Sequence, residues 1–212
     1  MRLKNIKGAK EIVENSKYII NNPREYKGKY QEIFKNKNKI NIEIGMGKGD
    51  FIIEMANQNP NINFIGIEMF DSVILRAVQK LENIELPNLR LIKLDATDIE
   101  EIFNKEIDTI YLNFSDPWPK NRHAHRRLTN ERFLKRYEKI FKSKCHIIQK
   151  TDNRHLFEHS IMSYVEENYK IEKLSLNLHE DLEAMEINNI ETEYEKKFSS
   201  QGMPIYMIEV YK

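Results

Sequence analysis

The stretch richest in chemistry is NFSDPWPKNRHAHRRL, which covers residues 113–128. It sets one acid, Asp116, beside a turn in which two prolines flank Trp118, the only tryptophan of the chain. Six basic residues follow, namely Lys120, Arg122, His123, His125, Arg126 and Arg127. The whole chain has a formal net charge of only +1, so this clustering is local. The acid beside this basic run predicts a catalytic carboxylate next to a binding surface for phosphate groups. The alternative is a charged surface that is only solvated and binds nothing.

A second candidate is the cluster of Gly45, Gly47 and Gly49 in EIGMGKGD, three of only seven glycines in the chain. Such clustering predicts a tight turn where the backbone approaches a ligand. The spacing does not fit GxxxxGK[ST], and Asp50 stands where the dinucleotide motif GxGxxG needs its last glycine. A carboxylate there would repel a pyrophosphate, which disfavours a nicotinamide dehydrogenase. The pattern favours S-adenosylmethionine, a nucleoside joined to an amino acid without phosphates; a plain glycine-rich turn is the alternative.

Four acids occur in series around the ends of the first four apolar runs: Glu43, Glu68, Asp95 and Asp116. An acid at the position of Glu68 can accept hydrogen bonds from both ribose hydroxyls of a nucleoside. Asp95 is placed to accept from an adenine amino group, and several carboxylates together suit a sulfonium cation. Any one of these acids alone could be an exposed strand end or a helix cap. The ordered series is more specific than any member of it.

The elements that position these residues alternate between strands and helices. Apolar runs predict strands over residues 39–45, 62–70, 89–96, 108–114, 145–153, 171–178 and 205–212. Helical spacing predicts helices over 50–59, 71–83, 131–141 and 154–168, after one short helix within 21–34 that begins at Pro23. This order predicts an α/β fold with a mainly parallel seven-stranded sheet and an antiparallel edge made by the last two strands. Such sheets bind ligands at the carboxyl ends of their strands.

Capping signals and domain limits complete the expected layout. Asp71 or Ser72 is expected to cap the helix over 71–83, and Asp152 the helix over 154–168. TEYE at residues 192–195 reads as a capping box, a role that can coexist with binding. We expect an N-terminal helical extension over 1–38 and one main domain over 39–212, within a single structural domain.

Composition excludes several classes of protein. No run of 18 apolar residues occurs, so we expect no membrane span. The N-terminus lacks the apolar segment of a signal peptide. Cys145 is the only cysteine, and the six histidines show no paired metal spacing, so we expect no metal site and a cytoplasmic setting. Whether the protein is a monomer or a homodimer is left open.

The motifs EIGMGKG, GIE, LDA, NFSDPWPKNRHAHRRL, KTDN and TEYEKKF follow one another in the order and spacing of bacterial tRNA (guanine-N7-)-methyltransferases. From about residue 21 to the C-terminus the chain resembles a full-length member of that family, and DPWPK with its basic tail is the most specific part. Residues 1–20 match less well. The resemblance implies a class I methyltransferase (Rossmann-like) fold, S-adenosylmethionine as cofactor, tRNA as partner and a variable-loop guanine, position 46, as target.

The resemblance also implies roles for particular residues. With the glycine loop, the expected cofactor contacts are Glu43, Gly45, Gly47, Gly49, Glu68, Asp95, Ala96 and Asp116, and Asp116 is the expected catalytic residue. The expected RNA contacts are Lys120, Arg122, His123, His125, Arg126, Arg127, Asp152, Thr192, Glu193, Tyr194 and Glu195. Independently of the resemblance, the large ring of Trp118 can offer its face to a base; a packing tryptophan in a rigid turn is the alternative.

Two other functions compete with this interpretation. Enzymes that methylate an exocyclic amine share the fold and often carry a D/N-P-P-aromatic turn. In this chain the turn is DPWP, in which the second proline and the aromatic residue have exchanged places, and this argues against that class. A catalytically silent RNA-binding protein would need the basic run but not the series of acids. Stoichiometric cofactor binding would discriminate between that protein and an enzyme.

Overall fold

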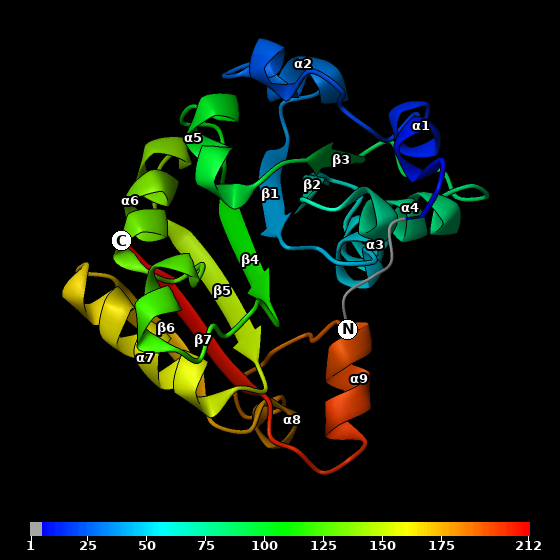
Figure 1. Cartoon of the computed structure of the whole chain (residues 1–212). Helices are drawn as coiled ribbons and strands as arrows, with labels where there is room; N and C mark the ends of the chain where they lie inside the picture. Colours follow the sequence, from blue (N-terminus) through cyan, green and yellow to red (C-terminus); the bar gives the residue numbers. More distant parts are fainter. Residues whose placement is uncertain (1–5) are drawn as a thin grey trace.

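The computed structural model describes residues 6–212, and its centre is one sheet of seven strands (Figure 1). The strands are β1 (Lys39–Ile44), β2 (Ile62–Glu68), β3 (Leu89–Lys93), β4 (Thr109–Asn113), β5 (His146–Thr151), β6 (Lys170–Ser175) and β7 (Tyr206–Tyr211). They lie in the order β3-β2-β1-β4-β5-β7-β6. The pairs among β1 to β5 are parallel, and β7 is antiparallel to β5 and β6. The predicted fold class is confirmed.

The last two strands form the antiparallel edge, but β7 lies inside it, between β5 and β6. Burial explains this order. Ile208 and Val210 of β7 have no exposed surface, whereas the first half of β6 is exposed and includes Ile171 at 41%. The more buried strand therefore takes the inner position, where both its edges pair with neighbouring strands.

Helices cover both faces of the sheet. They are α1 (Ala9–Glu14), α2 (Tyr30–Phe34), α3 (Asp50–Gln58), α4 (Asp71–Lys80), α5 (Ile99–Ile102), α6 (Glu131–Ile140), α7 (Arg154–Glu166), α8 (Leu178–Asp181) and α9 (Glu193–Ser199), with 3-10 helices η1 (Pro23–Tyr26), η2 (Ala96–Asp98) and η3 (Asn121–Arg126). One core cluster joins the sheet to α2, α5, α6 and α7, and another joins it to α1, α3 and α4. Ile42 and Ile44 belong to the first cluster, so the alternate residue Glu43 points to the α3 side.

The segment before β1 differs from the single short helix predicted within residues 21–34. It forms η1 and α2, and Gly28 between them has a φ of 76°, a left-handed conformation that interrupts a helix. Farther upstream, α1 packs on α4 through the buried Ala9 and Val13. The predicted N-terminal extension begins at residue 1, and residues 1–5 lie outside the described part of the chain.

Two of the predicted helix caps are wrong. The N-cap of α4 is Phe70, and no side chain caps that helix, whereas Asp71 or Ser72 was expected. The N-cap of α7 is Asn153, whose side-chain oxygen accepts from Leu156 N at 2.9 Å. Asp152 therefore does not cap α7, and this half-buried residue lies directly beyond β5.

Candidate active site at the carboxyl edge of the sheet

The predicted site residues gather where β1 to β5 end, an edge that we call the carboxyl edge. The glycine loop over 45–49 follows β1, and Glu68 is the last residue of β2. Asp95 follows β3, Asp116 follows β4 and Asp152 follows β5. Because these strands are parallel neighbours, their following residues share one edge of the sheet.

The glycine loop needs its glycines for two different reasons. Gly45, Gly47 and Gly49 have φ angles of 77°, 57° and 80°, which other residues rarely adopt. A Cβ atom on Gly49 would lie 2.9 Å from Ala77 Cβ, so this glycine also lets α3 approach α4. A Cβ on Gly45 or Gly47 would meet nothing within 4 Å. The space beside these two residues is therefore open to a ligand.

Glu43 is a buried carboxyl group with one unused oxygen. Its Oε1 accepts from Asn113 Nδ2 at 2.9 Å, while Oε2 has no hydrogen-bond partner among the described residues. Asn113 Oδ1 is likewise buried without a partner there. Burial raises the pKa of Glu43 to about 8, against the opposing hydrogen bond from Asn113 and the charge of Lys150. Two buried acceptors beside the glycine loop suit a ligand that carries several N–H donors.

Glu68 ties the end of β2 to the glycine loop. Its Oε1 accepts from Met69 N at 2.8 Å and Phe70 N at 3.2 Å, and its Oε2 accepts from Gly47 N at 3.3 Å. Burial raises the pKa of Glu68, and these three backbone donors oppose the rise. Each carboxylate oxygen has about two lone-pair positions, so Oε1 is fully used and Oε2 retains one position for a hydroxyl donor of a ligand.

Asp95 is exposed and caps η2. Its Oδ1 accepts from Thr97 N at 2.9 Å and Thr97 Oγ1 at 2.8 Å. The second oxygen, Oδ2, takes no part in this cap and is available to a ligand. Ala96, the first residue of η2, packs partly buried against the core beside it.

The turn after β4 has a strained backbone and is held by hydrogen bonds from a buried arginine. Phe114 and Trp118 have φ angles of 50° and 42°, each costing on the order of 1–2 kcal/mol for a residue with a Cβ. Arg127, only 7% exposed, donates from Nε to Pro117 O and from Nη2 to Trp118 O, both at 3.0 Å. The guanidinium of Arg127 is thus used inside the protein, which disfavours the predicted RNA contact through this residue. Asp116 is exposed on this turn.

Trp118 has one ring face covered by an arginine, which disfavours the predicted stacking of a base on that face. The Arg126 guanidinium lies over the ring, 4.8 Å from its centroid, and His123 meets it edge-on at 5.7 Å. The basic run forms η3, which leaves four basic residues exposed: Lys120, Arg122, His125 and Arg126. These four remain available to phosphate groups.

Helix α9, far along the chain, lies on the side toward which the arrowheads of β4 and β5 point in Figure 1. Thr192 caps it by accepting from Glu195 N at 3.0 Å, as predicted. Glu193 forms an ion pair with Lys48 of the glycine loop at 2.7 Å. Tyr194, 57% exposed, stacks on Phe114 with ring centroids 6.3 Å apart and planes 19° apart. The helix thus contacts both the loop after β1 and the turn after β4.

Glu195 departs from the expected role. Its side chain has no exposed surface and forms a buried ion pair with Lys150 of β5 at 2.5 Å. Both of its carboxylate oxygens are used within the protein, Oε2 by Lys150 and Oε1 by Asn189, which disfavours the predicted RNA contact through Glu195. Sequence reasoning also missed Lys150 and Asn113. Their only sequence signal is polarity at the end of otherwise apolar strands.

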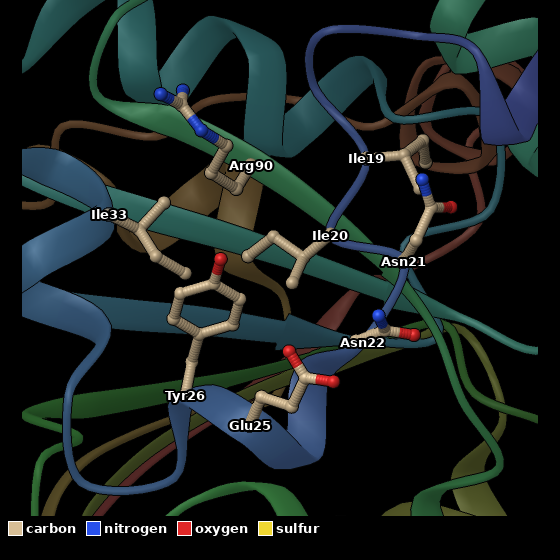
Figure 2. A pocket seen from close by; sticks show the side chains of 8 residues that line it. All are labelled: Ile19, Ile20, Asn21, Asn22, Glu25, Tyr26, Ile33 and Arg90. Carbon is tan, nitrogen blue, oxygen red and sulfur yellow. The ribbon is translucent and has the colours of Figure 1, made fainter.

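A separate hollow of about 300 Å³ lies at the amino end of β3 (Figure 2). Its lining residues are Ile19, Ile20, Asn21, Asn22, Glu25, Tyr26, Ile33 and Arg90. None of the predicted site residues is among them. The hollow is therefore distinct from the site at the carboxyl edge.

Within residues 6–212, no group of three or more histidine, cysteine, aspartate or glutamate side chains is arranged to hold a metal ion. The same residues contain no helix long and apolar enough to cross a membrane.

Comparison with known proteins gives concordant matches. A family model described as a putative methyltransferase matches residues 37–208. A tRNA (guanine-N(7)-)-methyltransferase of Lachnoclostridium phytofermentans is 47% identical, over 100% of this chain and 99% of the relative. A protein of the same name from Listeria innocua is 52% identical, over 99% of this chain and 97% of the relative. A solved structure of an antibiotic-related methyltransferase matches with a TM-score of 0.62 and 17% identity, over 87% of this chain and 92% of that one, which indicates a shared fold.

Proposed function

The chain belongs to the family of tRNA (guanine-N(7)-)-methyltransferases, and from this membership we propose that it methylates N7 of a guanine in tRNA with S-adenosylmethionine as the methyl donor. The observation that carries the proposal is identity of about half the residues over the whole chain. We further propose that the target is the variable-loop guanine at position 46 and that the protein acts in the cytoplasm.

The residues at the carboxyl edge fit the proposed cofactor. Glu43 Oε2 and Asn113 Oδ1 are buried without partners among the described residues, and an ammonium group of an amino acid supplies donors for both once Glu43 is ionised. Open space beside Gly45 and Gly47 lets a ligand lie against the loop. When bound, S-adenosylmethionine supplies a methyl group on a positively charged sulfur. We assign Glu68 to its ribose hydroxyls and Asp95 to its adenine amino group.

The proposed reaction does not require the protein to remove a proton from the substrate. Guanine N7 carries an in-plane lone pair and no proton, so its attack on a methyl carbon needs no general base. The purine gains positive charge as the new bond forms. We assign Asp116 to stabilise that charge, or to accept from the N1–H and N2–H edge of the base, since preorganised charges of this kind contribute strongly to catalysis.

We assign the exposed basic residues of η3 and the adjoining Lys120 to tRNA phosphates. Arg122, His125 and Arg126 share the surface of this segment with Lys120. Asp152 and the exposed Glu193 and Tyr194 of α9 lie along the same carboxyl edge and complete the proposed substrate surface. Phosphate contacts of this kind position the RNA without reading its sequence.

Nucleoside analysis tests the proposal directly. Purified protein is incubated with unmodified tRNA and S-adenosylmethionine, the tRNA is digested, and the methylated nucleoside is identified and mapped. We expect N7-methylguanine at a single position in the variable loop. Methyl on an exocyclic amine would replace this function with the competing enzyme class, and cofactor binding without any methylated product would contradict catalysis altogether.

A further inference from the structure

Lys150, at the carboxyl end of β5, is a buried lysine whose ammonium group is fully used. It donates to Glu195 Oε2 at 2.5 Å, to Ile190 O at 2.8 Å and to Asn189 Oδ1 at 3.0 Å. All three acceptors belong to the segment 189–195, which leads into α9. One side chain of the sheet thus holds the whole approach to that helix.

Glu195 completes the arrangement from the other side. Its Oε1 accepts from Asn189 Nδ2 at 2.6 Å and lies 3.2 Å from His179 Nε2 of α8. With no exposed surface, this carboxylate is shielded from water and held by contacts with Lys150, Asn189 and His179. The hydrogen bonds from Lys150 and Asn189 form a buried polar network that ties α9 to β5.

The backbone of Lys150 reaches the other half of the site. Its carbonyl oxygen accepts from Phe114 N at 2.8 Å, and Phe114 begins the strained turn that carries Asp116. Tyr194 of α9 stacks on the ring of the same Phe114. Lys150 therefore touches both the turn with the proposed catalytic acid and the segment with the proposed substrate contacts.

We propose that the Lys150–Glu195 ion pair is a positioning device that holds α9 in register with the Asp116 turn, so that tRNA bound on α9 presents its guanine correctly for methyl transfer. Neither side chain touches substrate in this role. The inference rests on the proposed function, which supplies the reaction being positioned. Without the pair, α9 keeps the exposed Lys48–Glu193 ion pair, the stacking of Tyr194 and the packing of Phe198 on the small apolar cluster around Leu178. None of these contacts reaches β5 through a buried charge, and a misplacement of about 1 Å can lower a rate ~100-fold.

The test uses a variant that removes both charges together. Lys150→Met alone would strand a buried carboxylate and destabilise the protein, whereas Lys150→Met/Glu195→Gln leaves no unpaired charge and preserves approximate volume. We expect its melting temperature to stay within about 4 °C of wild type. We expect single-turnover methyl transfer, measured with saturating tRNA and saturating cofactor, to slow ~10- to 100-fold.

Hydrogen exchange gives a readout independent of catalysis. Amides of residues 187–199 should exchange faster in the double variant, while those of β1, β4 and β5 keep their rates. The matched control is Lys212→Met/Glu138→Gln, which removes a tertiary ion pair of 2.6 Å away from the carboxyl edge. That variant should methylate at the wild-type rate and show unchanged exchange over 187–199.

A second variant keeps the test decisive if the double variant does not fold. Glu195→Asp retains both charges but shortens one side chain by a methylene, so it should slow methyl transfer while the protein stays folded. Wild-type rates in either folded variant, or unchanged exchange over 187–199, would overturn the positioning role. If the wild-type protein made no N7-methylguanine, the proposed function would be wrong. The exchange experiment would still show whether the Lys150–Glu195 pair holds α9 in place.

Discussion

At the scale of single residues, Glu43 links burial to pH. Its pKa is about 8 in the folded protein, chiefly because the carboxyl group is buried, and about 4.5 in the unfolded chain. The folded state therefore keeps a proton that the unfolded chain releases, and this contribution to stability is complete below pH ~4.5 and lost as pH rises through about 8.

Glu43→Gln should remove this dependence, because glutamine does not titrate. We expect the variant to match wild type near pH 5 and to exceed it in free energy of unfolding by pH 8–9. Urea denaturation across pH 5–9 measures the difference between the two proteins, so titrations common to both cancel. Parallel curves for the two proteins would mean that Glu43 is ionised in the fold throughout.

Asp116 carries a prediction about catalysis. Asp116→Asn keeps the shape of the exposed side chain and removes its charge, so single-turnover methyl transfer should fall by ~100- to 1000-fold while cofactor affinity is largely kept. The wild-type rate should show no general-base limb around neutral pH, because N7 has no proton to lose. Glu82→Gln, an exposed acid beyond α4, is the control and should be silent. An Asp116→Asn enzyme as fast as wild type would reduce the acid to a turn residue.

At the scale of elements, the turn after β4 and η3 divides its two last arginines between structure and binding. Arg127 lies inside and donates to two carbonyl groups of the turn, whereas Arg126 is exposed and covers Trp118. Adjacent positions with the same side chain therefore have different roles, and substituting each should affect different measurements.

Arg127→Ala should lower the free energy of unfolding by roughly 2 kcal/mol, as for lost hydrogen bonds from a charged donor. Arg126→Ala should cost at most about 1 kcal/mol, the value of an exposed cation–π contact. It should instead weaken tRNA binding and reduce the slope of log affinity against log salt by about one unit. Urea denaturation measures the change in stability, and binding assays at several salt concentrations measure the change in tRNA affinity. If Arg127→Ala instead weakened tRNA binding without lowering stability, Arg127 would be an RNA contact.

At the scale of the whole molecule, a net charge of +1 limits RNA binding to local contacts. The exposed basic residues near Asp116 include three that are always charged at neutral pH, namely Lys120, Arg122 and Arg126. Neutralising about three phosphates predicts a salt slope of roughly −2 to −3 for tRNA binding. A slope steeper than about −6, measured by titration from low to physiological salt, would show that lysines elsewhere on the molecule join the interface.

The fold class, the glycine loop and the series of strand-end acids could all be read from the chain. Each of these features rests on residues close in sequence: apolar runs with turn signals between them, and glycines two positions apart. Parallel strands bring their carboxyl ends together by topology alone, so Glu43, Glu68, Asp95 and Asp116 share an edge once the strands are known.

The interior roles of charged residues depended on the packed chain. Arg127 is buried because Pro117 and Trp118 turn their carbonyl groups toward it, and Glu195 because Lys150, 45 residues earlier, meets it inside the protein. The inner place of β7 likewise follows from how much apolar surface each of two strands can cover. A charge is left in water unless the fold supplies its partner, and partners so far apart in the chain are brought together only by tertiary packing.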